Sequence, residues 1–160
     1  MRKRMLFVPL LAAGLAFVAC EDDDDPAGPA TEFSVELNGA NERPDPVDSD
    51  GTGTATFEID GNTIEFTLTT NGLTDVTAAH IHGPADTEES AGVIVGLFSA
   101  QAEGAWTGTK TGSFDADDIT SNDVTTLDEL IALMRSGDTY VNVHTQANLA
   151  GEIRGQIEPN

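Results

Sequence analysis

The sequence predicts an all-β fold, an antiparallel Greek-key β-sandwich of about eight strands with one short inserted helix. Polar and apolar residues alternate over many short segments, and a period of two is the pattern of a strand with one buried face. The dipeptide Asp60-Gly61 separates two such segments, and glycine there supplies the positive φ of a tight hairpin turn. Short strands joined by hairpins, with a single helical segment, favour a sandwich.

The strands can be placed one after another along the chain. The first covers residues 32–37, in which Phe33, Val35 and Leu37 point to the same side. The clearest pair is the hairpin of residues 52–59 and 63–70. Further strands are predicted for residues 76–83, 92–98, 105–114, 139–145 and 152–158.

One segment has the spacing of a helix instead. Thr126 and Glu129 form a capping box, the arrangement that satisfies free backbone N–H groups at a helix N-terminus. Apolar residues follow at positions 127, 130, 131 and 134, and Gly137 ends the run. We therefore expect one helix over residues 127–136, lying across an edge or end of the strands.

The first residues predict export. Three basic residues at positions 2–4 precede an apolar stretch of residues 5–19, which is shorter than the roughly 20 residues of a membrane-spanning helix. Residues 1–19 are therefore interpreted as a signal peptide. Residues 16–20 (AFVAC) resemble a lipobox, so we expect a lipid on Cys20. The alternative is ordinary cleavage, with Cys20 as an incidental thiol.

Residues 20–31 are acidic and rich in proline and glycine, which predicts a flexible tether between the lipid and a domain of residues 32–159. Lipidation at Cys20 would anchor the protein to the membrane of the cell envelope, at the outer surface or in the periplasm. The acidic run resembles a signal for the outer cell surface, and a plain solvated spacer is the alternative.

The chain is strongly acidic, with a formal net charge of −21. Three of the seven Lys and Arg residues precede Cys20 and all 28 acidic residues follow it, so the mature chain is more acidic still. Such a chain repels nucleic acid. The expected partners are cations, neutral polymers or basic proteins, and solubility alone is the alternative explanation of the charge.

Two motifs carry a resemblance to a known family. Residues 79–85 (AHIHGPA) and 140–145 (YVNVHT), followed by 151–157 (GEIRGQI), are similar to the paired signatures of the CHRD domain, named from chordin. Residues 149–150 stand where family members commonly have a proline, and residues 86–89 are an acidic insertion. The resemblance implies an extracellular β module for binding, without a defined catalytic activity.

The three histidines fall within these motifs and are candidate metal ligands. His80 and His82 project from one face of a strand, and His144 lies on the polar face of another. If the strands are neighbours, three imidazoles could hold zinc or copper, with Glu152 as a candidate fourth ligand or supporting residue. The alternative is that these rings make structural hydrogen bonds.

Other kinds of site have less support. A His-x-His pair in a sandwich also resembles copper/zinc superoxide dismutase, but that two-metal site needs about twice as many histidines. Asp45, Asp48 and Asp50 could bind calcium, yet they lack the terminal glutamate of an EF-hand loop. No catalytic residues are assigned.

Three functions follow from the sequence. The first is an anchored, non-catalytic module that binds an extracellular protein or polymer, or an ion. The second is a metal-dependent protein, redox or hydrolytic, and the third is a structural envelope protein.

Overall fold

The computed structural model describes residues 29–104, 106 and 108–160. The predicted signal peptide, Cys20 and most of the predicted tether therefore lie outside the described residues. No helix within the described part combines the length and the apolar character needed to cross a membrane.

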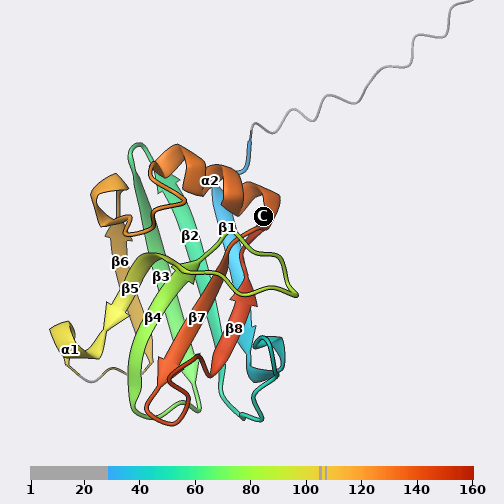
Figure 1. The fold of residues 1–160 in the computed structure, drawn as a ribbon. Coiled ribbons are helices and arrows are strands. Elements are labelled where there is room, and N and C mark those ends of the chain that lie inside the picture. Colours follow the sequence, from blue (N-terminus) through green and yellow to red (C-terminus); the bar gives the residue numbers. More distant parts are fainter. Residues whose placement is uncertain (1–28, 105, 107) are drawn as a thin grey trace, which may run out of the picture.

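The strands form one antiparallel sheet, in the spatial order β5-β4-β7-β8-β1-β2-β3-β6, with β9 paired to β1. This sheet curls so that its two halves face each other (Figure 1). The predicted class, an antiparallel sandwich of about eight strands, is confirmed. The strands are β1 (Glu32–Asn38), β2 (Thr52–Asp60), β3 (Thr63–Asn71), β4 (Val76–His82), β5 (Val93–Ser99), β6 (Thr109–Phe114), β7 (Tyr140–Thr145), β8 (Ile153–Gln156) and β9 (Glu158–Pro159).

The alternating residues supply the core between the two halves. Phe33 and Phe57 from one half and Ile81, Val141 and Ile153 from the other are all at most 2% exposed. A shift of any strand by one residue would move these side chains to solvent, so burial of one face fixes the strand register. The polar faces of β4, β7 and β8 consequently point outward.

The two halves of the sheet join at an irregular seam. In the described chain, β1 pairs with β8 at Asn38–Arg154 and with β9 at Phe33–Pro159 and Ser34–Glu158. Between these points β1 and β8 come very close, since a Cβ on Gly155 would lie 2.2 Å from the main-chain oxygen of Glu36. Glycine at this position permits the close approach.

Helix α2 (Leu127–Ser136) matches the predicted helix and covers one end of the sandwich (Figure 1). Its capping box is present, because Thr126 accepts a hydrogen bond from the backbone of Glu129 and Glu129 accepts one from the backbone of Thr126. Leu130, Ile131 and Met134 are buried against the core. The short 3₁₀ segments are η1 (Gly39–Asn41) and η2 (Ala116–Asp118).

Some elements differ from the prediction. The sixth strand begins at Thr109 instead of residue 105, because Gly108 has a φ of 89° that a regular strand does not permit. A second short helix, α1 (Ala100–Glu103), which was not predicted, lies between β5 and β6. The last predicted strand is divided into β8 and β9. Ile157 separates them and donates its backbone N–H to the main-chain oxygen of Thr139.

Candidate metal centre

The three histidines lie together on the outer face of two adjacent strands. His80 and His82 come from β4 and His144 from β7, and β4 and β7 pair with Ala78 opposite His144. The residues between them, including Ile81 and Val143, are fully buried on the inner face. The pairing of β4 with β7 therefore brings the two sequence motifs into one site.

The imidazole rings are close enough to share one ion. Nδ1 of His80 lies 3.1 Å from Nε2 of His144. One ring nitrogen from each histidine can be chosen so that all three lie within 4.8 Å of one another. The ring centroids of His80 and His82 are 5.6 Å apart, and those of His82 and His144 are 5.9 Å apart. Within the described residues, no other group of three such side chains is this close.

Backbone carbonyls fix the orientation of two of the rings. Nδ1 of His82 is 3.0 Å from the main-chain oxygen of Ala91, and Nδ1 of His144 is 3.1 Å from that of Leu149. A carbonyl oxygen only accepts hydrogen bonds, so each Nδ1 carries the proton and each Nε2 keeps its lone pair. This pattern is typical of metal-binding histidines, whose second nitrogen is held by a backbone or carboxylate acceptor.

Nε2 of His82 is buried and has no hydrogen-bond partner among the described residues. The side chain is only 8% exposed and stacks on Tyr140, with ring centroids 5.0 Å apart and planes 8° apart. An unpaired buried polar atom is costly, and most such atoms in proteins are satisfied by a partner, a water or an ion. The lone pair on Nε2 of His82 therefore receives no hydrogen bond from the described residues.

The site favours neutral imidazole. Burial and repulsion from His144 and His82 lower the pKa of His80 from 6.5 to about 4. Burial also lowers the pKa of His82 and of His144, and hydrogen bonds to Ala91 and Leu149 oppose the shift. Neutral imidazole is the form that binds metal ions, so the rings are in the required state at neutral pH.

Glu152, the candidate supporting residue, points elsewhere. Its carboxylate accepts hydrogen bonds from Ser49 at 2.7 Å and from Thr145 at 2.5 Å. Burial raises the pKa of Glu152, but these hydrogen bonds outweigh it and the pKa lies below its ordinary value. Glu152 is not part of the group of three histidines. It ties the loop before β2 to β7 in the described structure.

The aspartates at positions 45, 48 and 50 are exposed in the loop before β2. They do not gather with other candidate ligands into a group of three in the described chain. The structure therefore gives the calcium alternative no further support.

Glu42 is a buried acid to which sequence reasoning assigned no role at this site. It is 4% exposed, and its Oε2 accepts a hydrogen bond of 3.1 Å from Asn142, which lies on β7 opposite His80 and two residues before His144. Burial raises the pKa of Glu42 from 4.5 to about 7, and the hydrogen bond from Asn142 and the positive charge of Arg154 oppose this shift. A single acidic residue in a loop is usually solvated, so the sequence held no signal for its burial.

Fold and site together define an antiparallel β-sandwich module with a histidine cluster on its outer face. The family model of the CHRD domain matches residues 33–157. The chain therefore belongs to the CHRD domain family, which indicates a binding or structural module. A search of curated proteins and a search of solved structures gave no significant match.

Proposed function

We propose that this CHRD domain is an extracytoplasmic binding module that holds one zinc or copper ion through His80, His82 and His144. The observation that carries the proposal is the convergence of three ring nitrogens within 4.8 Å. The backbone partners of His82 and His144 support the proposal. Each main-chain oxygen binds Nδ1–H of its ring, which leaves the lone pair on Nε2 as the metal-binding atom.

The ligand type and spacing favour a transition metal over calcium or magnesium. Imidazole nitrogen suits zinc and copper, whereas calcium and magnesium prefer oxygen. Two nitrogens bound to tetrahedral zinc at about 2.0–2.1 Å lie about 3.4 Å apart. The separation of 3.1 Å between Nδ1 of His80 and Nε2 of His144, which is a hydrogen bond between the two rings, is close to this value, so an ion can take the place of the shared proton.

The proposed role of the ion is in binding or structure. Three histidines leave a further coordination position, which a donor from an extracellular protein or polymer could occupy. Redox or hydrolytic chemistry is the second candidate function. It has weaker support, because no carboxylate among the described residues joins the histidine group as an acid or base.

The test of the metal centre is metal content. The mature lipoprotein, purified without a histidine tag and exposed to Zn²⁺ or Cu²⁺ before desalting, is expected to retain about one ion per chain by mass spectrometry. His144→Ala removes one ligand, and His82→Phe removes Nε2 while preserving a ring to stack on Tyr140. Both variants are expected to lose most of the metal while keeping the β-sheet circular dichroism of the parent.

Glu152→Gln is the matched control, since Glu152 lies near the site but outside the group of ligands. It is expected to keep the metal. A wild-type protein that emerges free of both metals, or histidine variants that retain the full metal content, would contradict the proposal.

We also propose that a lipid on Cys20 anchors the domain to the membrane, with residues 20–31 as the tether. The basic residues, the apolar stretch and the lipobox-like segment support this assignment. Anchoring would place the module in the cell envelope, at the outer surface or in the periplasm. The acidic surface makes nucleic acid an unfavourable partner.

Export and anchoring can be tested together. Mass spectrometry of the mature N-terminus is expected to show a diacylglycerol on Cys20, and the protein should fractionate with membranes. Cys20→Ala should lack the lipid and leave the membrane fraction. Membrane association that survives Cys20→Ala would argue against the lipid anchor.

A further inference from the structure

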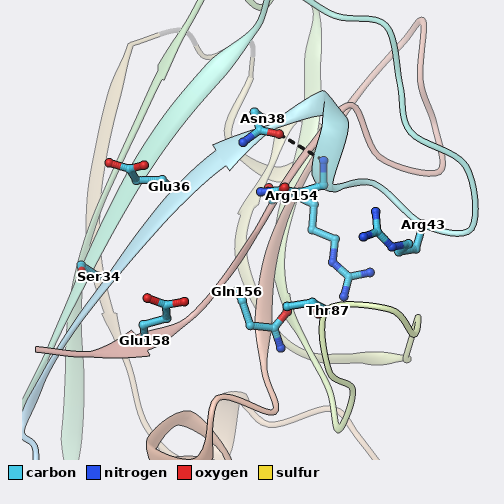
Figure 2. A pocket seen from close by; sticks show the side chains of 9 residues that line it. Ser34, Glu36, Asn38, Arg43, Thr87, Arg154, Gln156 and Glu158 are labelled. Carbon is cyan, nitrogen blue, oxygen red and sulfur yellow. Dashed lines mark hydrogen bonds between the residues drawn. The ribbon is translucent and has the colours of Figure 1, made fainter.

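A polar cavity of about 500 Å³ opens on the outer face where β1 meets β8 and β9 (Figure 2). Its position follows from the irregular seam of the sheet, at which β1 pairs with β8 at one end and with β9 at the other. This volume is within the range of small-molecule sites, about 300–1,000 Å³. The cavity is separate from the three histidines, none of which lines it.

One end of the cavity is cationic. Arg154 is only 2% exposed, and Figure 2 shows its guanidinium directed into the cavity beside Arg43. The guanidinium packs 3.5 Å from the ring centroid of Tyr140 and donates one hydrogen bond of 2.8 Å to the main-chain oxygen of Asp86. Within the described chain, Arg154 has no carboxylate at ion-pair distance.

This arrangement leaves unused hydrogen-bonding capacity. A guanidinium carries five N–H donors and keeps its charge in proteins. Burying such a group is costly unless acceptors satisfy it. Arg154 has a single hydrogen bond to the described residues, so an anionic group in the cavity would supply the acceptors that this buried charge lacks.

The second arginine is notable because the mature chain holds few basic residues. Only four follow Cys20, namely Arg43, Lys110, Arg135 and Arg154, and two of these line the same cavity. Arg43 also forms an ion pair of 3.2 Å with exposed Glu88. The exposed ion pair itself contributes little. Nη1 of Arg43 donates to the main-chain oxygens of Ala40 and Glu42, at 3.3 and 2.9 Å, and these bonds hold the guanidinium at this end of the cavity.

The opposite end of the cavity is anionic. Figure 2 shows Glu36 and Glu158 across the cavity from Arg43 and Arg154, and both carboxylates are exposed. A simple anion would be repelled by these groups and by the acidic surface as a whole. A ligand with a negative group at one end and a positive group at the other would instead be attracted to both ends of the cavity.

A polar acceptor without a partner lies between the two ends. Gln156 donates through Nε2 to the main-chain oxygens of Ala85 and Gly137, each at 2.7 Å, which fixes the orientation of its amide. Its Oε1 is buried and has no partner among the described residues. An N–H group of a ligand that reached this oxygen would supply its missing hydrogen bond.

We propose that this cavity binds a small zwitterion of the short-peptide class. The ligand carboxylate pairs with Arg43 and Arg154, the geometry for which the planar guanidinium is suited. The ligand ammonium lies near Glu36 and Glu158, and a peptide N–H can bond to Gln156. The inference is independent of the metal centre, because the two sites share no lining residue.

The test compares ligands that differ only at their ends. Alanylalanine and trialanine are titrated into the mature lipoprotein by isothermal calorimetry at low ionic strength, beside N-acetyl-alanylalanine and alanylalanine amide. At least one free peptide is expected to bind saturably. Acetylation or amidation should weaken binding at least tenfold, because each removes one of the two charges.

Variants locate the binding. Arg43→Gln and Glu158→Gln are each expected to lower the affinity for the free peptide at least fivefold. The control Arg135→Gln, in α2, should leave binding unchanged. The absence of saturable binding by both free peptides would overturn the proposal, as would equal affinity for the acetylated peptide or unchanged binding by Arg43→Gln.

Discussion

Replacing Glu42 by glutamine is expected to raise the free energy of unfolding by about 2–3 kcal/mol at pH 8 and to change it little at pH 5. Glu42 is 4% exposed, and its Oε1 is buried with no partner in the described part of the chain. Burial raises the pKa of Glu42 from 4.5 to about 7. The folded state therefore holds this carboxyl in its neutral form more readily than the unfolded chain does.

The sign of the pH dependence follows from the raised pKa. Between pH 4.5 and about 7 the folded protein binds more protons at Glu42 than the unfolded chain does. The contribution of Glu42 to stability is thus present at low pH and is lost as the pH rises through this window. Glutamine cannot ionise, so the variant escapes that loss, and its side-chain oxygen can still accept the hydrogen bond from Asn142.

Urea unfolding of the two proteins at pH 5, 6, 7 and 8 measures the effect. The stability difference should grow with pH and level off above about pH 7. Glu65→Gln, which changes an exposed carboxylate on β3, is the matched control and should show no such trend. If the free energies of unfolding of Glu42→Gln and wild type differed by the same amount at every pH, Glu42 would not have the raised pKa on which this prediction depends.

The strands could be predicted because one face of each is buried. Phe33, Val35 and Leu37 mark β1 so clearly that its start is correct, and helix α2 is correct at both ends because a capping box precedes it and a glycine follows. The sixth strand was predicted too long at its start, since the predicted segment of residues 105–114 includes Gly108, whose positive φ precedes the first residue of β6. The alternation of polar and apolar residues does not reveal such an interruption of the strand backbone.

The histidine site could be predicted only in part. Alternation places His80 and His82 on one face, but the contact with His144 depends on the pairing of β4 with β7, across 64 positions of chain. The carbonyls that hold the rings come from Ala91 and Leu149 in loops, where the sequence carries no signal. Long-range pairing and loop backbone are set by the whole fold.

The cavity was not predicted at all. Arg154 lies in a strand whose outward residues are expected to be solvated, yet it stacks on Tyr140 and is 2% exposed. Its burial depends on the loop after β4, whose Asp86 carbonyl accepts its hydrogen bond. Amphipathic side chains such as arginine can be buried by this type of covering loop without any change in local pattern.

Zinc or copper is expected to raise the midpoint of thermal unfolding of the metal-free domain by roughly 10 °C at a free-metal concentration 100 times the dissociation constant. The folded state brings His80, His82 and His144 together, whereas the unfolded chain separates His144 from His80 by 64 positions. An ion that needs all three rings binds the folded state and stabilises it by about 2.7 kcal/mol at this concentration.

The shift should increase with the logarithm of metal concentration and vanish on addition of a chelator. His82→Phe should lose it, and Glu152→Gln should keep it, because only the first removes a member of the histidine group. Calcium and magnesium serve as controls for the acidic surface, since they prefer oxygen ligands. A shift of equal size with calcium, or in His82→Phe, would place the binding on the carboxylates instead of the histidines.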